Sequence, residues 1–115
     1  MENQPDAKLL RIFIGEADKW GHQPLYEKIV FESRKAGLSG ATVLKGIMGY
    51  GANAKISSAK LFEISEDLPL VIEIVDVESK VRGFSKTVKE LLEKSGSGAM
   101  ITLEKAEVIF YKSTK

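Results

Sequence analysis

The stretch "LVIEIVDVESKVRGFSKTVKELLEKSG", residues 70–96, indicates the fold most directly in this chain of 115 residues. Its first seven residues are mostly β-branched or apolar, which predicts a strand. Apolar residues then recur at the spacing of one helical face: Val81, Phe84, Val88, Leu91 and Leu92. This predicts an amphipathic helix, with Asp76 as its N-cap and Gly96 near its end.

The segments on either side repeat the alternation of strand and helix. Residues 25–37 have a helical period, with Pro24 in the first turn and Gly37 just past the end. Further strands are expected at residues 8–16, 41–51, 57–65 and 100–111, the last as one interrupted strand or two short ones. The order βαββαβ predicts a ferredoxin-like α+β fold, an antiparallel sheet with both helices on one face. Because "VIEIV" alternates only weakly, we expect the second face to be covered by another copy of the chain.

Composition limits the protein class. Residues 8–115 are expected to form a single domain, with residues 1–7 as a flexible N-terminus. The chain has 17 basic and 16 acidic residues, a net charge of +1, which argues against a nucleic-acid partner. It has no cysteine. No apolar run approaches the roughly 18 residues of a membrane span, so a cytoplasmic location is expected.

Three glycines, Gly46, Gly49 and Gly51, follow the β-branched run "ATV". Either the chain turns sharply here, or a ligand approaches its backbone. The connection over residues 49–58 is longer than a tight hairpin needs, and backbone N–H groups in such a loop can surround an anion. A flexible hairpin without a ligand is the alternative.

Other polar residues have simpler interpretations. The "SGSG" at residues 95–98 suits a helix C-cap and turn, and Trp20 suits a packing position. His22 is the single histidine and suits a capping or surface position. No Ser–His–Asp set can be assembled around it and no metal site is expected, so the chain is not expected to be an enzyme.

The order of these motifs resembles that of PII-type signalling proteins. In that family a strand runs into a Gly-aromatic-Gly stretch, a mobile loop (the T-loop) follows, and a Gly-x-Gly turn (the B-loop) precedes the last strands. The matching residues here are Gly49-Tyr50-Gly51, Leu68-Pro69, Ile72–Val75 and Gly96-Ser97-Gly98. The chain is closer still to the short uncharacterised PII-like proteins of a domain-of-unknown-function family, through "LYEKIV" and "GLSGATVLKGIMGYG". This resemblance covers the chain from Leu9 onward.

The resemblance implies a homotrimer that holds an adenine nucleotide in clefts between subunits, with no prosthetic group. Carried over position by position, the ligand-binding residues are Gly49, Tyr50, Gly51, Ala52, Asn53, Gly96, Ser97, Gly98, Ala99 and Lys112. Where the family places phosphate-facing cations, this chain has Ala52, Ala99 and Phe110, and Lys112 alone is basic. Because a lost charge-assisted hydrogen bond costs about 1.5–3 kcal/mol, AMP or ADP is expected in preference to ATP.

Three functions are therefore compared. The first is a non-enzymatic sensor whose loop reports a bound nucleotide to a regulated protein, for example a membrane transporter. The second is a structural trimer or transporter-associated subunit that binds no nucleotide. The third is a small enzyme of the ferredoxin-like type that uses Tyr50 or His22. The glycines favour the first, and the loss of basic residues favours the second.

Overall fold

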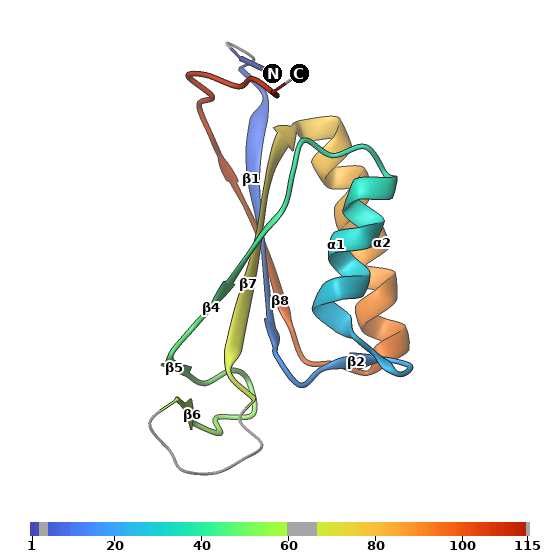
Figure 1. Cartoon of the computed structure of the whole chain (residues 1–115), viewed down its shortest axis with the longest axis vertical. Coiled ribbons are helices and arrows are strands. Elements are labelled where there is room, and N and C mark those ends of the chain that lie inside the picture. Colours follow the sequence, from blue (N-terminus) through green and yellow to red (C-terminus); the bar gives the residue numbers. More distant parts are fainter. Residues whose placement is uncertain (3–4, 60–66, 115) are drawn as a thin grey trace.

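A long antiparallel ladder between β1 (Ala7–Gly15) and β7 (Pro69–Val77) forms the centre of the fold. The computed structural model describes residues 1–2, 5–59 and 67–114. Strands β8 (Met100–Lys105) and β4 (Thr42–Lys45) add to the two sides, which gives the antiparallel order β4-β7-β1-β8. Helices α1 (Leu25–Lys35) and α2 (Glu78–Ser95) lie together on one face of this sheet (Figure 1). The predicted ferredoxin-like fold is confirmed.

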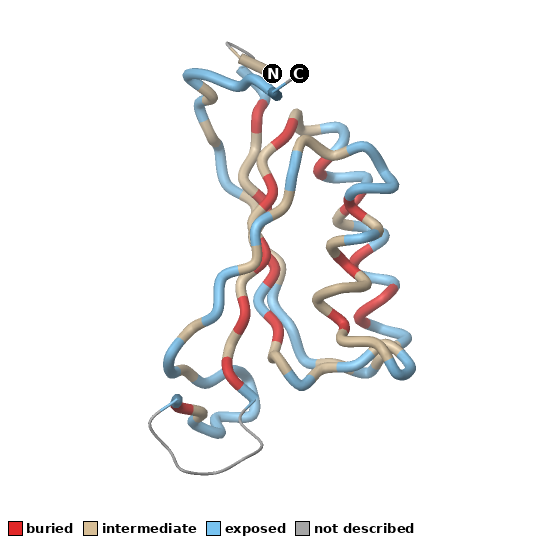
Figure 2. Tube along the Cα trace, in the orientation of Figure 1, coloured by how far each residue is buried: buried red, intermediate tan, exposed pale blue. Residues whose placement is uncertain are grey.

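The core lies between the sheet and the helices, where Figure 2 shows the buried positions. Alternate residues of β1 and β7 point toward the helices and are at most 5% exposed: Leu10, Ile12, Ile14, Leu70, Ile72 and Ile74. The predicted apolar face of α2 packs against them, with Val81 and Val88 fully buried. Full burial of such side chains stabilises the fold by about 1.5–3 kcal/mol each.

The other face of the sheet carries both apolar and polar residues, and neither helix covers it. We call it the open face; its residues on the four strands are Leu9, Arg11, Phe13, Thr42, Leu44, Val71, Glu73, Val75, Met100, Thr102 and Glu104. Among them Leu44 is 48% and Met100 60% exposed. Arg11 lies near the middle of the face, with Nε 2.9 Å from Glu73 Oε2 and Nη1 2.5 Å from Glu104 Oε1.

Asp76 does not cap α2, contrary to the prediction. Strand β7 extends through Val77, so the Asp76 side chain points into the helix-covered side and is 5% exposed. Its carboxylate accepts hydrogen bonds from the N–H of Ser39, at 2.9 Å, and of Val77, at 2.7 Å. The N–H of Glu78 instead donates to the Asp6 carbonyl, at 2.9 Å.

Several predicted boundaries shift. Residues expected to form loop make a short ladder of β2 (Lys19–Trp20) with β3 (Gln23–Pro24). Of the strand predicted over 57–65, β6 (Ser57–Ser58) pairs with β5 (Met48–Gly49), and residues 60–65 lie outside the described residues. The last strand ends at Lys105, so the strand structure predicted for 106–111 is wrong. None of the helices in the described ranges is long and apolar enough to span a membrane.

Replacing Asp76 with alanine should destabilise the fold by about 1–3 kcal/mol, because the Ser39 N–H loses its acceptor. Asp6→Ala is the matched control, since Asp6 is exposed and contributes its backbone carbonyl to the hydrogen bond with Glu78. Urea unfolding followed by circular dichroism measures both variants. Equal stability of the two variants would contradict the role given to the Asp76 carboxylate.

Candidate functional site

The two glycine-rich segments lie at the same end of the sheet (Figure 1). Strand β4 runs toward this end and continues into the β5–β6 hairpin, and α2 ends there before β8 begins. We call this region the glycine end, made of residues 46–53 and 95–99. The hairpin follows β4 and the turn precedes β8, and these two strands form opposite edges of the sheet. One chain therefore presents both segments at one end without bringing them together.

Two of the three hairpin glycines have a packing role. The Gly46 N–H donates to the Pro69 carbonyl at 2.7 Å, and a Cβ on Gly46 would lie 2.8 Å from Pro69 Cγ. A Cβ on Gly49 would lie 3.1 Å from the same atom. Gly51 has open space around it. Close contact with Pro69 therefore explains why glycine occurs at positions 46 and 49. Of the three hairpin glycines, Gly51 alone is open to a ligand.

The residues after Gly51 form a turn that projects from the molecule. The Ala54 N–H donates to the Gly51 carbonyl at 2.9 Å, and Ala54 has a φ of 61°. Asn53 Oδ1 accepts the N–H of Lys55 at 3.1 Å, which leaves the side-chain NH₂ to donate elsewhere. Tyr50 is 73% exposed, and Ala52 and Asn53 are exposed beside it.

The turn after α2 contains hydrogen bonds between two of its own residues, Ser95 and Ser97. Gly96 adopts the left-handed conformation with φ 74°, and its N–H donates to the Leu92 carbonyl at 3.0 Å. Ser95 Oγ lies 3.1 Å from Ser97 Oγ and accepts the Ser97 N–H at 3.3 Å. Gly98 and Ala99 follow, and a Cβ on Gly98 would meet open space. Helix termination therefore accounts for Gly96, whereas Gly98 is unconstrained within the chain.

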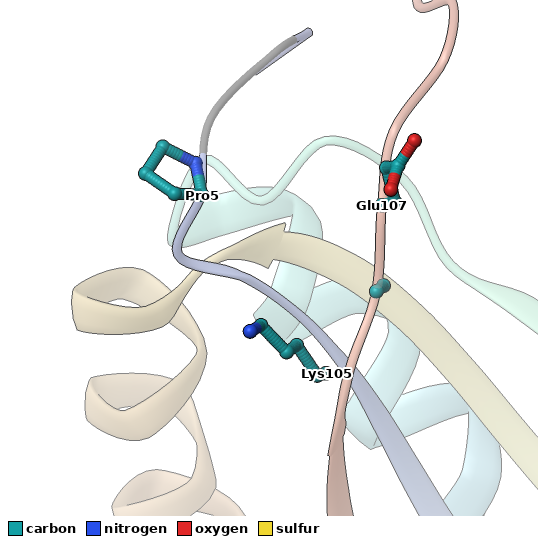
Figure 3. A pocket seen from close by; sticks show the side chains of 4 residues that line it. Pro5, Lys105 and Glu107 are labelled. Atoms are coloured by element: carbon teal, nitrogen blue, oxygen red, sulfur yellow. The ribbon is translucent and has the colours of Figure 1, made fainter.

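Lys112, also predicted to contact the ligand, follows β8 at the opposite end of the sheet (Figure 1). An open hollow of about 440 Å³ lies at that end between Pro5, Lys105, Ala106 and Glu107 (Figure 3). Within one chain, Lys112 is thus separated from the other predicted ligand residues by the length of the sheet.

Acidic residues that the ligand prediction did not include also lie at the glycine end. Asp67 Oδ1 accepts the N–H of Ala17, and Asp18 Oδ2 accepts the N–H of Gly15, both at 2.8 Å. A Cβ on Gly15 would lie 2.3 Å from Asp67 Oδ1, so a larger residue there would displace the Asp67 carboxylate. The sequence does show "GE", Gly15-Glu16, directly after the first strand. It could not show that Gly15 lies against Asp67, because Asp67 is distant in sequence. Among the described residues no group of three His, Cys, Asp or Glu side chains could hold a metal ion.

One basic side chain near this end, Lys45, is already paired with a carboxylate. Lys45 Nζ lies 2.7 Å from Glu16 Oε2.

Trp20 packs partly buried against the core, as predicted, with Lys28 Nζ 5.7 Å from its ring centre. His22 is exposed in the turn before β3 and does not cap α1, whose N-cap is Pro24.

The comparisons with known proteins agree with this architecture. Residues 7–108 match the model of the family DUF190, described as "Uncharacterized ACR, COG1993". A UPF0166 protein of Aquifex aeolicus (strain VF5) is 39% identical over 103 residues, which cover 90% of this chain and 93% of the relative.

Two solved structures are similar in fold. A Thermus thermophilus protein described as PII-like aligns with a TM-score of 0.65 and 14% identity, over 90% of this chain and 89% of that one. CPII of Thiomonas intermedia K12, a nitrogen regulatory PII-like protein solved with ADP, AMP and bicarbonate, aligns with a TM-score of 0.58 and 17% identity over 89% of each chain. At these identities the likeness shows the fold, and the predicted PII-like fold is confirmed.

Gly46→Ala should destabilise the protein by about 1–3 kcal/mol, because the new methyl group overlaps the rigid ring of Pro69. Gly51→Ala is the matched control in the same loop and should change stability by less than about 0.5 kcal/mol. Thermal unfolding of the two variants beside the parent chain provides the comparison. If Gly46→Ala unfolds like the control, the contact with Pro69 does not explain this glycine.

The stability of Asp18→Asn relative to the parent chain should depend on pH. Burial raises the pKa of the Asp18 carboxyl, the hydrogen bond from the Gly15 N–H opposes the rise, and the Asp67 carboxylate adds to it. Because the folded chain holds this proton to higher pH than the unfolded chain, Asp18 lowers stability as pH rises through the window above the ordinary value of 3.8. The stability advantage of Asp18→Asn, which keeps an acceptor for Gly15, should be greater at about pH 7 than at about pH 4.

Urea unfolding at the two pH values measures this advantage. Asp6→Asn serves as the control, because it removes an exposed aspartate at the other end of β1. An advantage that stays constant with pH would show that Asp18 titrates at the same pH in the folded and unfolded chains.

Proposed function

The chain belongs to the DUF190 family, and we propose that it is a PII-like regulatory protein without catalytic activity. In this proposal three copies form a ring and bind an adenine nucleotide, AMP or ADP in preference to ATP, in the clefts between neighbours. The hairpin beyond Gly51 then reports the bound nucleotide to a partner protein.

The position of the two glycine-rich segments is the observation that carries the proposal. They lie at one end of the molecule but adjoin opposite edge strands: the hairpin follows β4 and the turn precedes β8. A ligand that contacts both segments must therefore lie between the β4 edge of one copy and the β8 edge of the next. A head-to-tail contact of this kind closes into a ring when the rotation between copies is suitable, as in a trimer.

The open face supports self-association. Leu9, Phe13, Leu44, Val71, Val75 and Met100 present apolar side chains there, and contiguous apolar patches on soluble proteins usually mark an interaction surface. The central Arg11 is bonded to Glu73 and Glu104 of its own chain. Another copy can therefore cover this face without leaving that charge unpaired.

The charges at the glycine end favour a nucleotide with few phosphates. Gly51 and Gly98 leave backbone open to phosphate oxygens. The nearby Lys45 is engaged with Glu16, and the Asp18 and Asp67 carboxylates lie at the same end. A triphosphate would meet more repulsion here than AMP or ADP, since like charges repel more strongly near a protein surface than in bulk water. ADP and AMP are the nucleotides held by the structural relative CPII.

The hairpin has the composition of a contact surface for a partner protein. Ile47, Met48, Tyr50 and Ile56 are each more than half exposed. A nucleotide at the base of the hairpin would favour one of its conformations, and a partner that recognises this conformation would be recruited.

Isothermal titration calorimetry with AMP, ADP and ATP tests nucleotide binding. AMP or ADP should bind more tightly than ATP, and Gly51→Val and Gly98→Val should each weaken binding at least about tenfold by blocking the approach to the backbone, a loss of about 1.4 kcal/mol. Both valines enter open space within the chain. Gly40→Val is the matched control, because Gly40 also has open space but lies at the other end of the sheet.

The outcomes separate the functions. Loss of binding in the two variants, with normal binding in the control, supports the sensor. If none of the three nucleotides binds while the protein is trimeric in analytical ultracentrifugation, the structural or transporter-associated trimer is favoured.

A further inference from the structure

The segment after β8 has the residue composition of a strand, but few of its backbone groups form hydrogen bonds with the described residues of its own chain. We call residues 106–112 the arm. Its first N–H, that of Ala106, donates to the Ala7 carbonyl at 3.1 Å and continues the β1–β8 ladder by one bond. Beyond it, the arm is fixed at Tyr111, whose N–H donates to Glu2 Oε1 at 3.0 Å and whose hydroxyl donates to the Ser39 carbonyl at 3.2 Å.

The middle of the arm is exposed and apolar. Ile109 is 74% and Phe110 73% exposed. Within the described part of the chain, the N–H groups of Val108, Ile109 and Phe110 have no hydrogen-bond partner. β-Branched and aromatic residues in sequence are typical of a strand, and a strand of this composition is stabilised when its backbone pairs with a sheet edge.

The arm does not pack tightly on its own sheet. One hollow of about 440 Å³ lies where the arm leaves β1, between Pro5 and Glu107 (Figure 3). A second, of about 460 Å³, lies between the arm and the sheet and is bordered by Met1, Ser39 and Val75. Since Val75 belongs to the open face, the arm leaves part of that face unfilled.

We propose that the arm adds as a strand to the free edge of β4 in a second copy of the chain. Strand β4 pairs only with β7 among the described strands, so its other edge has backbone groups available. A strand partner satisfies the unpaired N–H groups of the arm, which an apolar small molecule in the hollows cannot do.

The direction of the strands identifies β4 as the receiving edge. The first part of the arm continues the direction of β8 before the segment turns toward the N-terminus, and β4 runs opposite to β8 (Figure 1). When the β8 edge of one copy faces the β4 edge of the next with the same ends together, the arm meets the beginning of β4 antiparallel. This is the arrangement that brings the two glycine-rich segments together at the other end, so the inference rests on the self-association in the proposed function.

Disulfide trapping tests the contact directly, because the chain has no cysteine. Single-cysteine variants are made in the arm, Val108→Cys and Phe110→Cys, and in β4, Thr42→Cys and Leu44→Cys. Each arm variant is mixed with each β4 variant carrying a mass tag, oxidised at low protein concentration, and analysed by mass spectrometry. Two strands side by side allow the short Cβ separations that a disulfide needs.

Thr102→Cys, on the β8 edge and also on the open face, is the matched control for Thr42→Cys, and Lys86→Cys on α2 is an exposed control. Mixed arm–β4 disulfides in large excess over both controls are expected. A dominant disulfide with Thr102→Cys, a dominant arm–arm disulfide, or equal yields with all positions would each overturn the proposal.

Ile109→Pro provides an independent measurement, because proline removes an N–H from the arm and prevents central strand pairing. It should raise the dissociation constant of the trimer in analytical ultracentrifugation, with an unchanged circular dichroism spectrum. Ser113→Pro, beyond the arm, should leave assembly unchanged. A trimer unaffected by Ile109→Pro and without arm–β4 disulfides would overturn the arm alone. A parent chain that is monomeric at all concentrations would overturn the arm together with the proposed assembly.

Discussion

The pairing of β1 on both sides is the constraint on which the rest of the structure depends. Strand β1 pairs along its whole length with β7 and over Lys8–Phe13 with β8. Because side chains alternate along a strand, Leu10 and Ile12 point to the helices while Leu9 and Phe13 point to the open face. Both faces thus carry apolar side chains, but one chain supplies helices for one face only. The helices therefore cover one face of the sheet, and the other face is left for association with a second copy.

The charged residues of the open face make that association feasible. A buried charge that loses its partner is strongly destabilising, whereas a pair that keeps its hydrogen bonds is close to neutral. The hydrogen bond with Glu73 raises the pKa of the Arg11 guanidinium, although desolvation partly opposes the rise. Glu104 completes the group from the neighbouring strand. Since all three groups belong to one chain, Arg11 needs no counter-charge from the copy that covers the face, and the second carboxylate leaves the group with one net negative charge.

The sequence predicted what local pattern determines and failed where a distant residue decides. The apolar periods of residues 70–96 correctly predicted β7 and α2. Aspartate is common at helix N-caps, but the Asp76 carboxylate accepts its hydrogen bond from the N–H of Ser39, which comes from the other half of the fold. Gly46 likewise suggested a ligand until Pro69, from another strand, was placed against it. The segment 106–111 was predicted as strand from its composition, but among the described residues only the Ala106 N–H continues the β1–β8 ladder. Among the predicted ligand residues, the sequence identified two loops but could not show that they adjoin opposite edge strands of the sheet.

The two proposed contacts occupy opposite ends of one seam, between the β4 edge of one copy and the β8 edge of the next. The glycine-rich segments lie at one end and the arm at the other, so both depend on the same relative position of two copies. Any ligand that binds only the assembled form stabilises that form in proportion to its concentration and affinity. By linkage the effect is reciprocal: an arm that tightens the seam must raise the affinity for the nucleotide by the same factor as the nucleotide tightens the seam. A sensor built this way needs no conformational path through the core, because the interface itself couples the ligand, the hairpin and the arm.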